Sequence, residues 1–245
     1  MIANLFRTTP FTALLLLAAG AAAAMGSITG SGKLATEARG ASGFTGIALA
    51  ISGRVEVTQG DKESVSVTAD DNLLPEIETV VEGGVLKIRW RNRVNIMHST
   101  SIRIAVTAKS IETLAVGGSG DIVSAALRTR DLKVSIGGSG NVRLSSLTAA
   151  ALTVSIGGSG DFTGEGTADS LTANVAGSGD IEAGRLATRN VKVNVAGSGD
   201  ATVWAKGDLN VSVAGSGDVK YYGDPTLKSA IVGSGSLKRL GSAPA

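Results

Sequence analysis

An aspartate follows most copies of a repeated Gly-Ser-Gly triplet, and this series of carboxylates is the part of the sequence best suited to metal chemistry. The series consists of Asp121, Asp161, Asp180, Asp200 and Asp218, with Asn141 at one position and Ser236 at the last. If the triplets stack, neighbouring carboxylates lie about 4.8 Å apart and repel one another. A ladder of calcium ions would relieve this repulsion, because calcium prefers oxygen ligands. Alternatively, each Asp accepts hydrogen bonds from the backbone of its turn, which agrees with the uncharged Asn141 in the series.

A run of cations around Trp90 could bind an anionic ligand. Arg89, Arg91 and Arg93 are spaced two residues apart, so a strand would place all three on one face. With Trp90 alongside, this face is a candidate surface for an anionic glycan or a lipid headgroup. The alternative is a charged edge strand whose cations discourage aggregation.

Residues suited to catalysis are sparse. The chain has no cysteine and one histidine, His98, which excludes thiol chemistry and leaves only His98 for a serine triad. Glu165 and Asp169 are candidates for a glycosidase pair. Outward cations such as Arg143 or Lys192 could serve a polysaccharide lyase. No local cluster around them resembles such a site, so we expect no catalytic residue and no cofactor.

These side chains would be positioned by the Gly-Ser-Gly triplet, which recurs seven times at intervals of 18 to 20 residues. Such a period is the signature of a solenoid. Each triplet is expected to form a tight corner, because glycine adopts positive φ without a clash of its Cβ. The corner glycines are Gly118, Gly120, Gly138, Gly140, Gly158, Gly160, Gly177, Gly179, Gly197, Gly199, Gly215, Gly217, Gly233 and Gly235.

Short segments of alternating apolar residues precede and follow each corner. Leu132, Val134 and Ile136 precede one corner, and similar patterns precede the others. Alternation of this kind is typical of strands with one buried face. The sequence therefore predicts an all-β fold, a parallel β-solenoid with coils of about 18–20 residues. Only eight residues are aromatic, as expected for a narrow core of Val, Ile, Leu and Ala.

The two ends of the chain differ from the repeats. The first residues have the charge, apolar run and small-residue end of a secretory signal peptide. The expected division is a signal peptide at 1–24, a flexible linker at 25–38, a single solenoid domain at 39–240 and a tail at 241–245. Within the domain, residues 39–110 form an irregular β-rich cap with a short helical turn near 71–78, and residues 111–240 carry the repeats. The cap would cover the unpaired backbone groups of an open end.

Several features of the cap recur in a known bacterial family. They are Arg39, Phe44, Ile47, the strand Val55-Glu56-Val57, the segment Asp70-Asp71-Asn72-Leu73-Leu74 and the hairpin Gly83-Gly84-Val85-Leu86-Lys87-Ile88. Together with the Gly-Ser-Gly-Asp repeats, they make the chain resemble the "putative auto-transporter adhesin, head GIN domain" family from Arg39 to Leu240. The resemblance implies a right-handed parallel β-helix similar to pectin-lyase folds, no conserved catalytic residues and a role in adhesion.

These features indicate an exported, non-catalytic solenoid that binds or adheres in the periplasm or at the cell surface. The formal charge is only +2, so nucleic acid is not an expected partner. No apolar stretch of spanning length follows the signal peptide, so no integral membrane segment is expected. The expected partners are a glycan or another cell-surface component, and further copies in a homo-oligomer. Two alternatives stay open: a carbohydrate-active enzyme of the polysaccharide lyase type on the same fold, and a purely structural envelope component.

Overall fold

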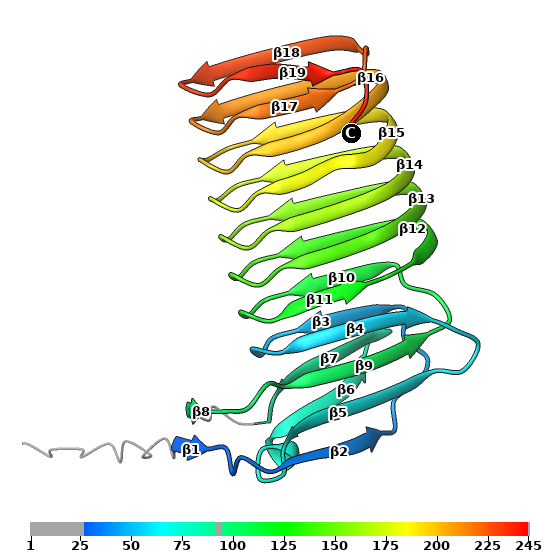
Figure 1. Cartoon of the computed structure of the whole chain (residues 1–245), viewed down its shortest axis with the longest axis vertical. Coiled ribbons are helices and arrows are strands. Elements are labelled where there is room, and N and C mark those ends of the chain that lie inside the picture. The colour runs from blue at the N-terminus through cyan, green and yellow to red at the C-terminus, as the bar shows by residue number, and fades with distance from the viewer. Residues whose placement is uncertain (1–26, 92–94, 245) are drawn as a thin grey trace, which may run out of the picture.

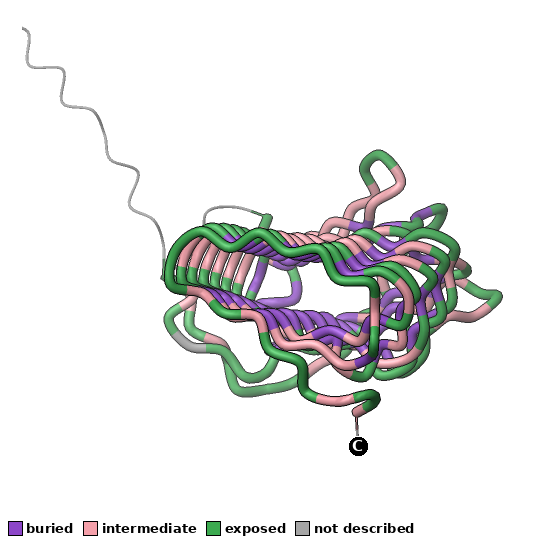
Figure 2. Tube along the Cα trace, turned by 90° about the horizontal axis from the view of Figure 1, so that it is seen from above, coloured by how far each residue is buried: buried purple, intermediate pink, exposed green. Residues whose placement is uncertain are grey.

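The protein is a rod of stacked β-coils that ends in an irregular cap on its N-terminal side (Figure 1). The structure, a computed structural model, describes residues 27–91 and 95–244. Two ladders of strands face each other across the core, as the view along the rod shows (Figure 2). The predicted parallel β-solenoid is confirmed, whereas the predicted signal peptide lies outside the described residues.

The first ladder holds the strands that lead into the corners. In order from the cap it consists of β7 (Val85–Trp90), β3 (Gly46–Leu49), β10 (Thr113–Val116), the C-terminal parts of β12 (Leu127–Ile136), β13 (Val142–Ile156), β14 (Phe162–Val175), β15 (Ile181–Val195) and β16 (Ala201–Gly215), and β18 (Thr226–Gly233). The register is regular: Ser135 pairs with Ser155, and Ser155 pairs with Asn174. One sequence repeat therefore forms one coil.

The second ladder holds the strands that leave the corners. In the same order it consists of β9 (Arg103–Ala108), β4 (Arg54–Gln59), β11 (Asp121–Ser124), the N-terminal parts of β13 to β16, β17 (Val219–Tyr222) and β19 (Leu237–Gly241). All of these pairings are parallel, and the side chains between the two ladders form the core.

The order of the coils along the rod differs from their order in the sequence. β3 pairs with β7 on one side and with β10 on the other, and β4 pairs in the same way with β9 and β11. After β4 the chain runs into the cap, forms the strands up to β9 and then returns to continue the rod at β10 (Figure 1). The first coil along the chain is therefore an interior coil.

The cap ends the rod by changing from parallel to antiparallel pairing. β2 (Leu34–Arg39) pairs with β5 (Ser64–Asp70), β5 pairs with β9, and β6 (Ile77–Glu82) pairs with β7, all antiparallel. A 3₁₀ turn, η1 (Leu74–Glu76), lies between β5 and β6, where the sequence predicted a short helical turn. A separate two-stranded sheet joins β1 (Ser27–Thr29) to β8 (Asn95–His98).

The expectation of a flexible linker at 25–38 is wrong for the described part of that segment. It contains β1 and most of β2, and its backbone is bonded to the cap: the Ser31 N–H donates to Asn72 Oδ1 at 2.9 Å. β2 is exposed along much of its length, so it lacks the strong apolar alternation from which strands are predicted. The ordered domain therefore begins before Arg39. At the other end, β19 continues to Gly241, one residue into the expected tail.

Asp70 holds the N-terminal segment to the cap from a fully buried position. Its carboxylate accepts hydrogen bonds from the Gly32 N–H at 2.9 Å and from the Thr100 N–H and hydroxyl, both at 2.8 Å. The Thr100 N–H is the main cause that keeps the pKa of Asp70 below its ordinary value, against the opposing effect of burial. The ionised carboxylate is thus the form that the cap stabilises.

Replacing Asp70 with asparagine is expected to lower Tm at neutral pH and to flatten the decline of Tm in acid. A carboxyl with a lowered pKa contributes stability above its unfolded-state pKa and loses it as the pH falls through the lowered folded-state value. Thermal unfolding of both proteins between about pH 7 and about pH 3 measures this effect, with the exposed Asp169→Asn as the control. A Tm difference that stays constant across this range would contradict a role for the Asp70 charge.

Close packing between coils, rather than positive φ, requires glycine at most corners. Among the fourteen corner glycines only Gly215 and Gly233 have positive φ, of 148° and 121°. Elsewhere an added Cβ would collide with the neighbouring coil: at Gly138 it would lie 2.1 Å from the Gly118 carbonyl oxygen. The conformational reason expected from the sequence is therefore wrong for the other twelve glycines.

The core consists of Val, Ile, Leu and Ala side chains from both ladders, together with two buried phenylalanines, Phe44 and Phe162. The period-two pattern explains this composition, because only every second residue of each strand faces the space between the ladders. In the part of the chain that the structure describes, no helix has the length and apolar character needed to span a membrane.

Candidate ligand-binding groove

The aspartates after the corners form a series of hydrogen bonds that runs along the rod. Asp161 Oδ1 accepts from the Asp180 N–H at 2.9 Å, and Asp180 Oδ1 accepts from the Asp200 N–H at 2.7 Å. Asp200 Oδ1 in turn accepts from the Asp218 N–H at 2.8 Å. Each carboxylate therefore bonds the backbone of the next coil, and not that of its own turn as the sequence led us to expect.

The two ends of this series use the same geometry. Asp121 Oδ1 accepts from the Asn141 N–H at 3.1 Å, and Asp218 Oδ1 accepts from the N–H and hydroxyl of Ser236, both at 2.8 Å. The Ser236 hydroxyl and N–H lower the pKa of Asp218. Among the described residues, no three Asp, Glu or His side chains are grouped closely enough to hold a metal ion. The hydrogen bonds give the carboxylates a structural role that needs no calcium.

Replacing Asp180 with alanine is expected to reduce the free energy of unfolding by about 1–2 kcal/mol, because the Asp200 N–H loses its acceptor. The matched control is Asp180→Asn, which should remain close to wild type because Asn141 already accepts from the Asp161 N–H at 2.9 Å. Urea unfolding followed by circular dichroism measures both variants. Equal losses for the two would show that the charge matters and would contradict this explanation.

The structure separates Trp90 from the arginine beside it. Along β7 Trp90 turns inward and packs against the core, while Arg89 lies on the opposite face. Arg89 is also paired, with Nε 2.7 Å from Glu78 Oε2 and Nη2 3.0 Å from Glu82 Oε1. The hydrogen bond to Glu78 is the main cause that raises the pKa of Arg89. The cationic surface with an aromatic face that the sequence suggested is therefore not assembled here.

The remaining members of that cationic run add little to a binding surface. Arg91 is exposed just beyond the end of β7, and its N–H donates to the Glu76 carbonyl at 2.7 Å. Arg93 lies outside the described residues. The alternative of a charged edge strand is wrong as well, because β7 pairs with β3 on one side and with β6 on the other.

A groove of about 370 Å³ lies on the outer face of the second ladder, where the strand register is interrupted. On β15 and β16, Ala183 pairs with Val203, and the next pair is Ala187 with Trp204. Residues 184–186 of β15 therefore have no partner in β16. Smaller shifts occur at the same place between β13 and β14 and between β14 and β15. Such bulges redirect side chains and are frequent beside functional sites. The lining residues are Thr163, Gly164, Glu165, Glu182, Gly184, Arg185, Thr202, Tyr222 and Pro244.

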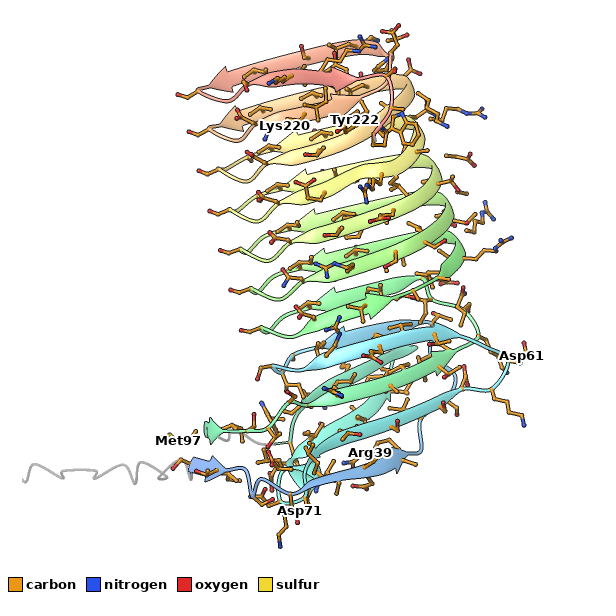
Figure 3. All side chains as sticks on the ribbon, viewed as in Figure 1. Arg39, Asp61, Asp71, Met97, Lys220 and Tyr222 are labelled. Atoms are coloured by element: carbon orange, nitrogen blue, oxygen red, sulfur yellow. The ribbon has the colours of Figure 1, made fainter. Side chains whose placement is uncertain are left out.

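The groove lies beside the aromatic residues that the described chain presents on its outer surface. Tyr222 lines it, as its position on β17 in Figure 3 shows, and Trp204 is the partner of Tyr222 in the adjacent strand. The other described aromatic residues are Phe44 and Phe162, which are buried, and Trp90 and Tyr221, which pack against the core. The ammonium of Lys206 lies 4.9 Å from the centre of the Trp204 ring. The groove thus combines a hollow with a partly exposed aromatic surface.

Acids and hydroxyls dominate the polar side of the groove. The Thr202 hydroxyl is 3.5 Å from Glu182 Oε1, and Arg185 Nη1 is 3.9 Å from Glu165 Oε1. Partial burial raises the pKa of Glu182, while the Thr202 hydroxyl opposes that shift. The groove holds the carboxyl groups of Glu165 and Glu182 and a single cation, Arg185, so it has no excess of positive charge with which to attract an anion. This mixture suits a neutral ligand rich in hydroxyl groups better than an anion.

The other residues considered for catalysis are not gathered in this groove. Glu165 lines it, but Asp169 does not. Lys192 lies at a separate shallow hollow on the first ladder together with Lys228. Arg143 is an exposed residue of β13, and His98 belongs to β8 beside the cap. The structure therefore does not assemble the glycosidase pair that the sequence raised as an alternative.

Comparison with known proteins identifies the family. The family model described as "Putative auto-transporter adhesin, head GIN domain" matches residues 43–225. The chain belongs to this family. The resemblance based on the repeats and the cap is confirmed, and no curated protein matches the chain.

Solved structures share the GIN-type fold of this chain. A "putative adhesin" from Bacteroides fragilis is 29% identical, with a TM-score of 0.84, and the match covers 87% of this chain and 100% of that one. A "putative lipid binding protein" from Parabacteroides distasonis is also 29% identical, with a TM-score of 0.75 and coverage of 88% and 100%. A "putative adhesin" from Parabacteroides merdae, 20% identical with a TM-score of 0.70 and coverage of 87% and 99%, has the same fold. The GIN family is thus associated by description with adhesion and binding.

Sequence reasoning missed Trp204 and Tyr222 of this GIN-family chain. A signal was available, because each lies two residues after an outward-facing polar residue, Thr202 or Lys220. Alternation along a strand therefore predicts that both aromatic side chains share the outer face. The register shifts that open the groove beside them have no comparable signal in the sequence.

Proposed function

We propose that the protein is an exported, non-catalytic binding protein of the cell envelope or surface, and that it holds a glycan in the groove beside Tyr222. Export is supported by the signal-peptide pattern of the first residues. The observation that carries the binding proposal is the placement of Tyr222, with Trp204 next to it, beside a hollow lined by carboxyl and hydroxyl groups. Sugars present apolar C–H faces and polar edges, and an aromatic face with a few oriented polar groups complements both.

A lipid is a less suitable ligand, although one relative is described as a putative lipid binding protein. The space between the ladders is filled by side chains, many of them fully buried. An acyl chain would therefore have to lie in an outer cleft, and in this groove it would bury the Glu165, Glu182 and Arg185 side chains, whose charges are costly to remove from water. Binding to a lipid surface is tested below with the same Tyr222 variants as glycan binding.

The test is a glycan array screened with the purified protein, followed by calorimetric titration of any glycan that binds. Tyr222→Ala is expected to weaken binding by at least about tenfold, because aromatic contacts dominate many binding sites. Tyr222→Phe, which keeps the ring, is the matched control and should retain most of the affinity. Arg89→Ser, outside the groove, should bind as wild type does.

Three results would overturn the proposal. The first is that no glycan on the array binds. The second is that Tyr222→Ala binds as tightly as wild type. The third is binding to phospholipid vesicles that Tyr222→Ala abolishes, which would assign the groove to a lipid surface instead. If Arg89→Ser lost binding while both Tyr222 variants kept it, the binding site would lie at the cap and not in the groove.

A further inference from the structure

The C-terminal end of the rod has no cap in the described chain. All eight residues of β18 are exposed. One coil earlier the inward-facing Leu209 and Val213 are 0% and 1% exposed, whereas their partners on β18, Leu227 and Ile231, are 40% and 38% exposed. Four of the six exposed large apolar residues in the described chain belong to this last coil. The chain after β19 turns to the side of the rod, where Pro244 lines the groove, and so does not cover the end.

The last coil also presents backbone donors along the rod axis. In the coil before it, the Val219 N–H donates to the Ser236 carbonyl at 2.8 Å, and the equivalent residues of earlier coils donate in the same way. Leu237 holds this position in the last coil, in register with Val219. Since no further coil is described, the Leu237 N–H points into the open end.

Backbone acceptors lie on the other half of the same coil. The last core-facing residue before each corner gives its carbonyl oxygen to the next coil, as Val175 does to the Ala196 N–H at 2.7 Å. Ile231 is in register with Val213, and, through Val213 and Val195 of the two intervening coils, with Val175. Its carbonyl therefore points into the open end, on the ladder opposite to that of the Leu237 N–H. The end thus has a donor on one ladder and an acceptor on the other.

We propose that a second copy of this chain covers the open end, related by a two-fold axis that runs between the ladders, parallel to the strands. This axis places β18 of one copy along β19 of the other. The last corners of the two copies, at Ser234, then lie next to each other. Because β18 and β19 run in opposite directions, the new pairing is antiparallel. Ile231 then lies opposite the partner's Leu237, so the carbonyl of one meets the N–H of the other, and symmetry makes this contact twice.

Charge and side-chain pairing agree with this register. Lys238 lies opposite the partner's Ala230, and Lys228 lies near the bulge at the partner's Leu240, a residue that β19 skips in its pairing with β17. No two cations of the paired strands face each other directly, so like-charge repulsion across the interface is avoided. The apolar side chains of Ile231 and Leu237 continue the core from one copy into the other.

The area available is enough for a specific interface. The eight residues of β18 span roughly 26 Å at about 3.3 Å per residue. Two sheets about 10 Å apart, with side chains on both outer faces, are roughly 20 Å across. The footprint is therefore on the order of 500 Å² per copy and about 1,000 Å² in total, near the lower limit for specific interfaces.

Contact between the open end and the cap of another copy fits less well. The cap edge is not flat, because η1 and the β1–β8 sheet lie beside β2 (Figure 1). Its carboxylates are already paired, as Glu82 is with Lys87 and Glu37 with Arg39. Such head-to-tail contacts would also produce open filaments, whereas the two-fold contact closes at two copies.

The decisive test uses a single introduced cysteine, since the chain has none. In the proposed register Ser234, at the last corner, lies opposite the partner's Ser234, within the range of Cα separations that a disulfide bridges. Ser234→Cys is expected to form a covalent dimer under mild oxidation. Ser198→Cys, at an equivalent exposed corner inside the rod, is the matched control and should stay monomeric on a denaturing gel.

Sedimentation of the unmodified protein provides the second readout. We expect a reversible dimer, with a dissociation constant raised at least about tenfold by Ile231→Lys and unchanged by Leu34→Lys, which alters an exposed leucine at the opposite end. Circular dichroism verifies that each variant is folded. A wild-type protein that stays monomeric at about 100 μM, well above the Kd of specific interfaces, overturns the proposal. So does equal cross-linking of Ser198→Cys, or concentration-dependent growth beyond two copies.

Discussion

Alanine in place of Gly160 should prevent the central coils from forming, with a loss of more than about 4 kcal/mol in the free energy of unfolding. The added Cβ would lie 1.9 Å from the Gly140 carbonyl oxygen and 3.0 Å from Ile136 Cγ2. Neither atom is the end of a flexible side chain, so the coils would have to move apart. Coil separation is fixed by the inter-strand hydrogen bonds at about 4.8 Å, and these bonds would be lost. Soluble expression and circular dichroism measure the outcome.

The matched control for this substitution lies in the same corner. At Gly157, three residues earlier, an added Cβ meets nothing within 4 Å. Gly157→Ala should therefore express and unfold like wild type, or be slightly more stable, because alanine reduces the entropy of the unfolded chain. If both variants were equally impaired, flexibility and not space would be the reason for glycine at these corners.

Truncating Phe162 to alanine should reduce the free energy of unfolding by about 3–5 kcal/mol. The ring is fully buried in the second ladder, in register with Val142 and Ile181. It also occupies the space beside Gly164, where an added Cβ would lie 2.8 Å from the ring. Removal of the ring therefore leaves a cavity in the core beside Gly164, which has no side chain to fill it. Urea unfolding of the variant gives the value.

Phe162→Leu is the control, because it keeps most of the apolar volume and should lose clearly less stability than Phe162→Ala. A loss below about 1 kcal/mol for Phe162→Ala would mean that the coils collapse around the missing ring and are not rigidly packed. Since Gly164 lines the groove and lies against this ring, the alanine variant should also weaken the binding of any ligand held beside Tyr222.

The repeats allowed the rod to be predicted because sequence and structure share one period. Leu132, Val134 and Ile136 recur with each triplet, and the ladders pair those residues with their counterparts one repeat later. A period-two pattern has only one way to bury its apolar face, so fold class, coil length and inward-facing residues all follow from it. The family resemblance followed from the same repeats.

The cap and the groove depend on contacts that no local pattern encodes. β2 becomes a strand because β5 offers it an edge, not because of its own apolar spacing. Trp90 and Arg89 are adjacent in sequence, yet a strand sends them to opposite faces, and Glu78 on β6 pairs with the arginine from a position eleven residues away. The groove arises where consecutive coils differ in length. The spacing of the triplets, 18 to 20 residues, shows that the coils differ, but it does not show that the unpaired residues are 184–186.

The placement of β3 and β4 between later coils makes the rod mechanically unequal at its two ends. Tension at the C-terminal end would detach β19 and β18, each held to the rod along a single edge, and would unwind one coil after another. Tension from the N-terminal side can first detach β1 and β2, each paired with a single strand, but it then meets β3, which is bonded on both edges, to β7 and to β10. Both edges of β3 must be sheared together before that strand can leave. A protein that adheres through such a rod would therefore resist pulling far better when it is tethered through its cap.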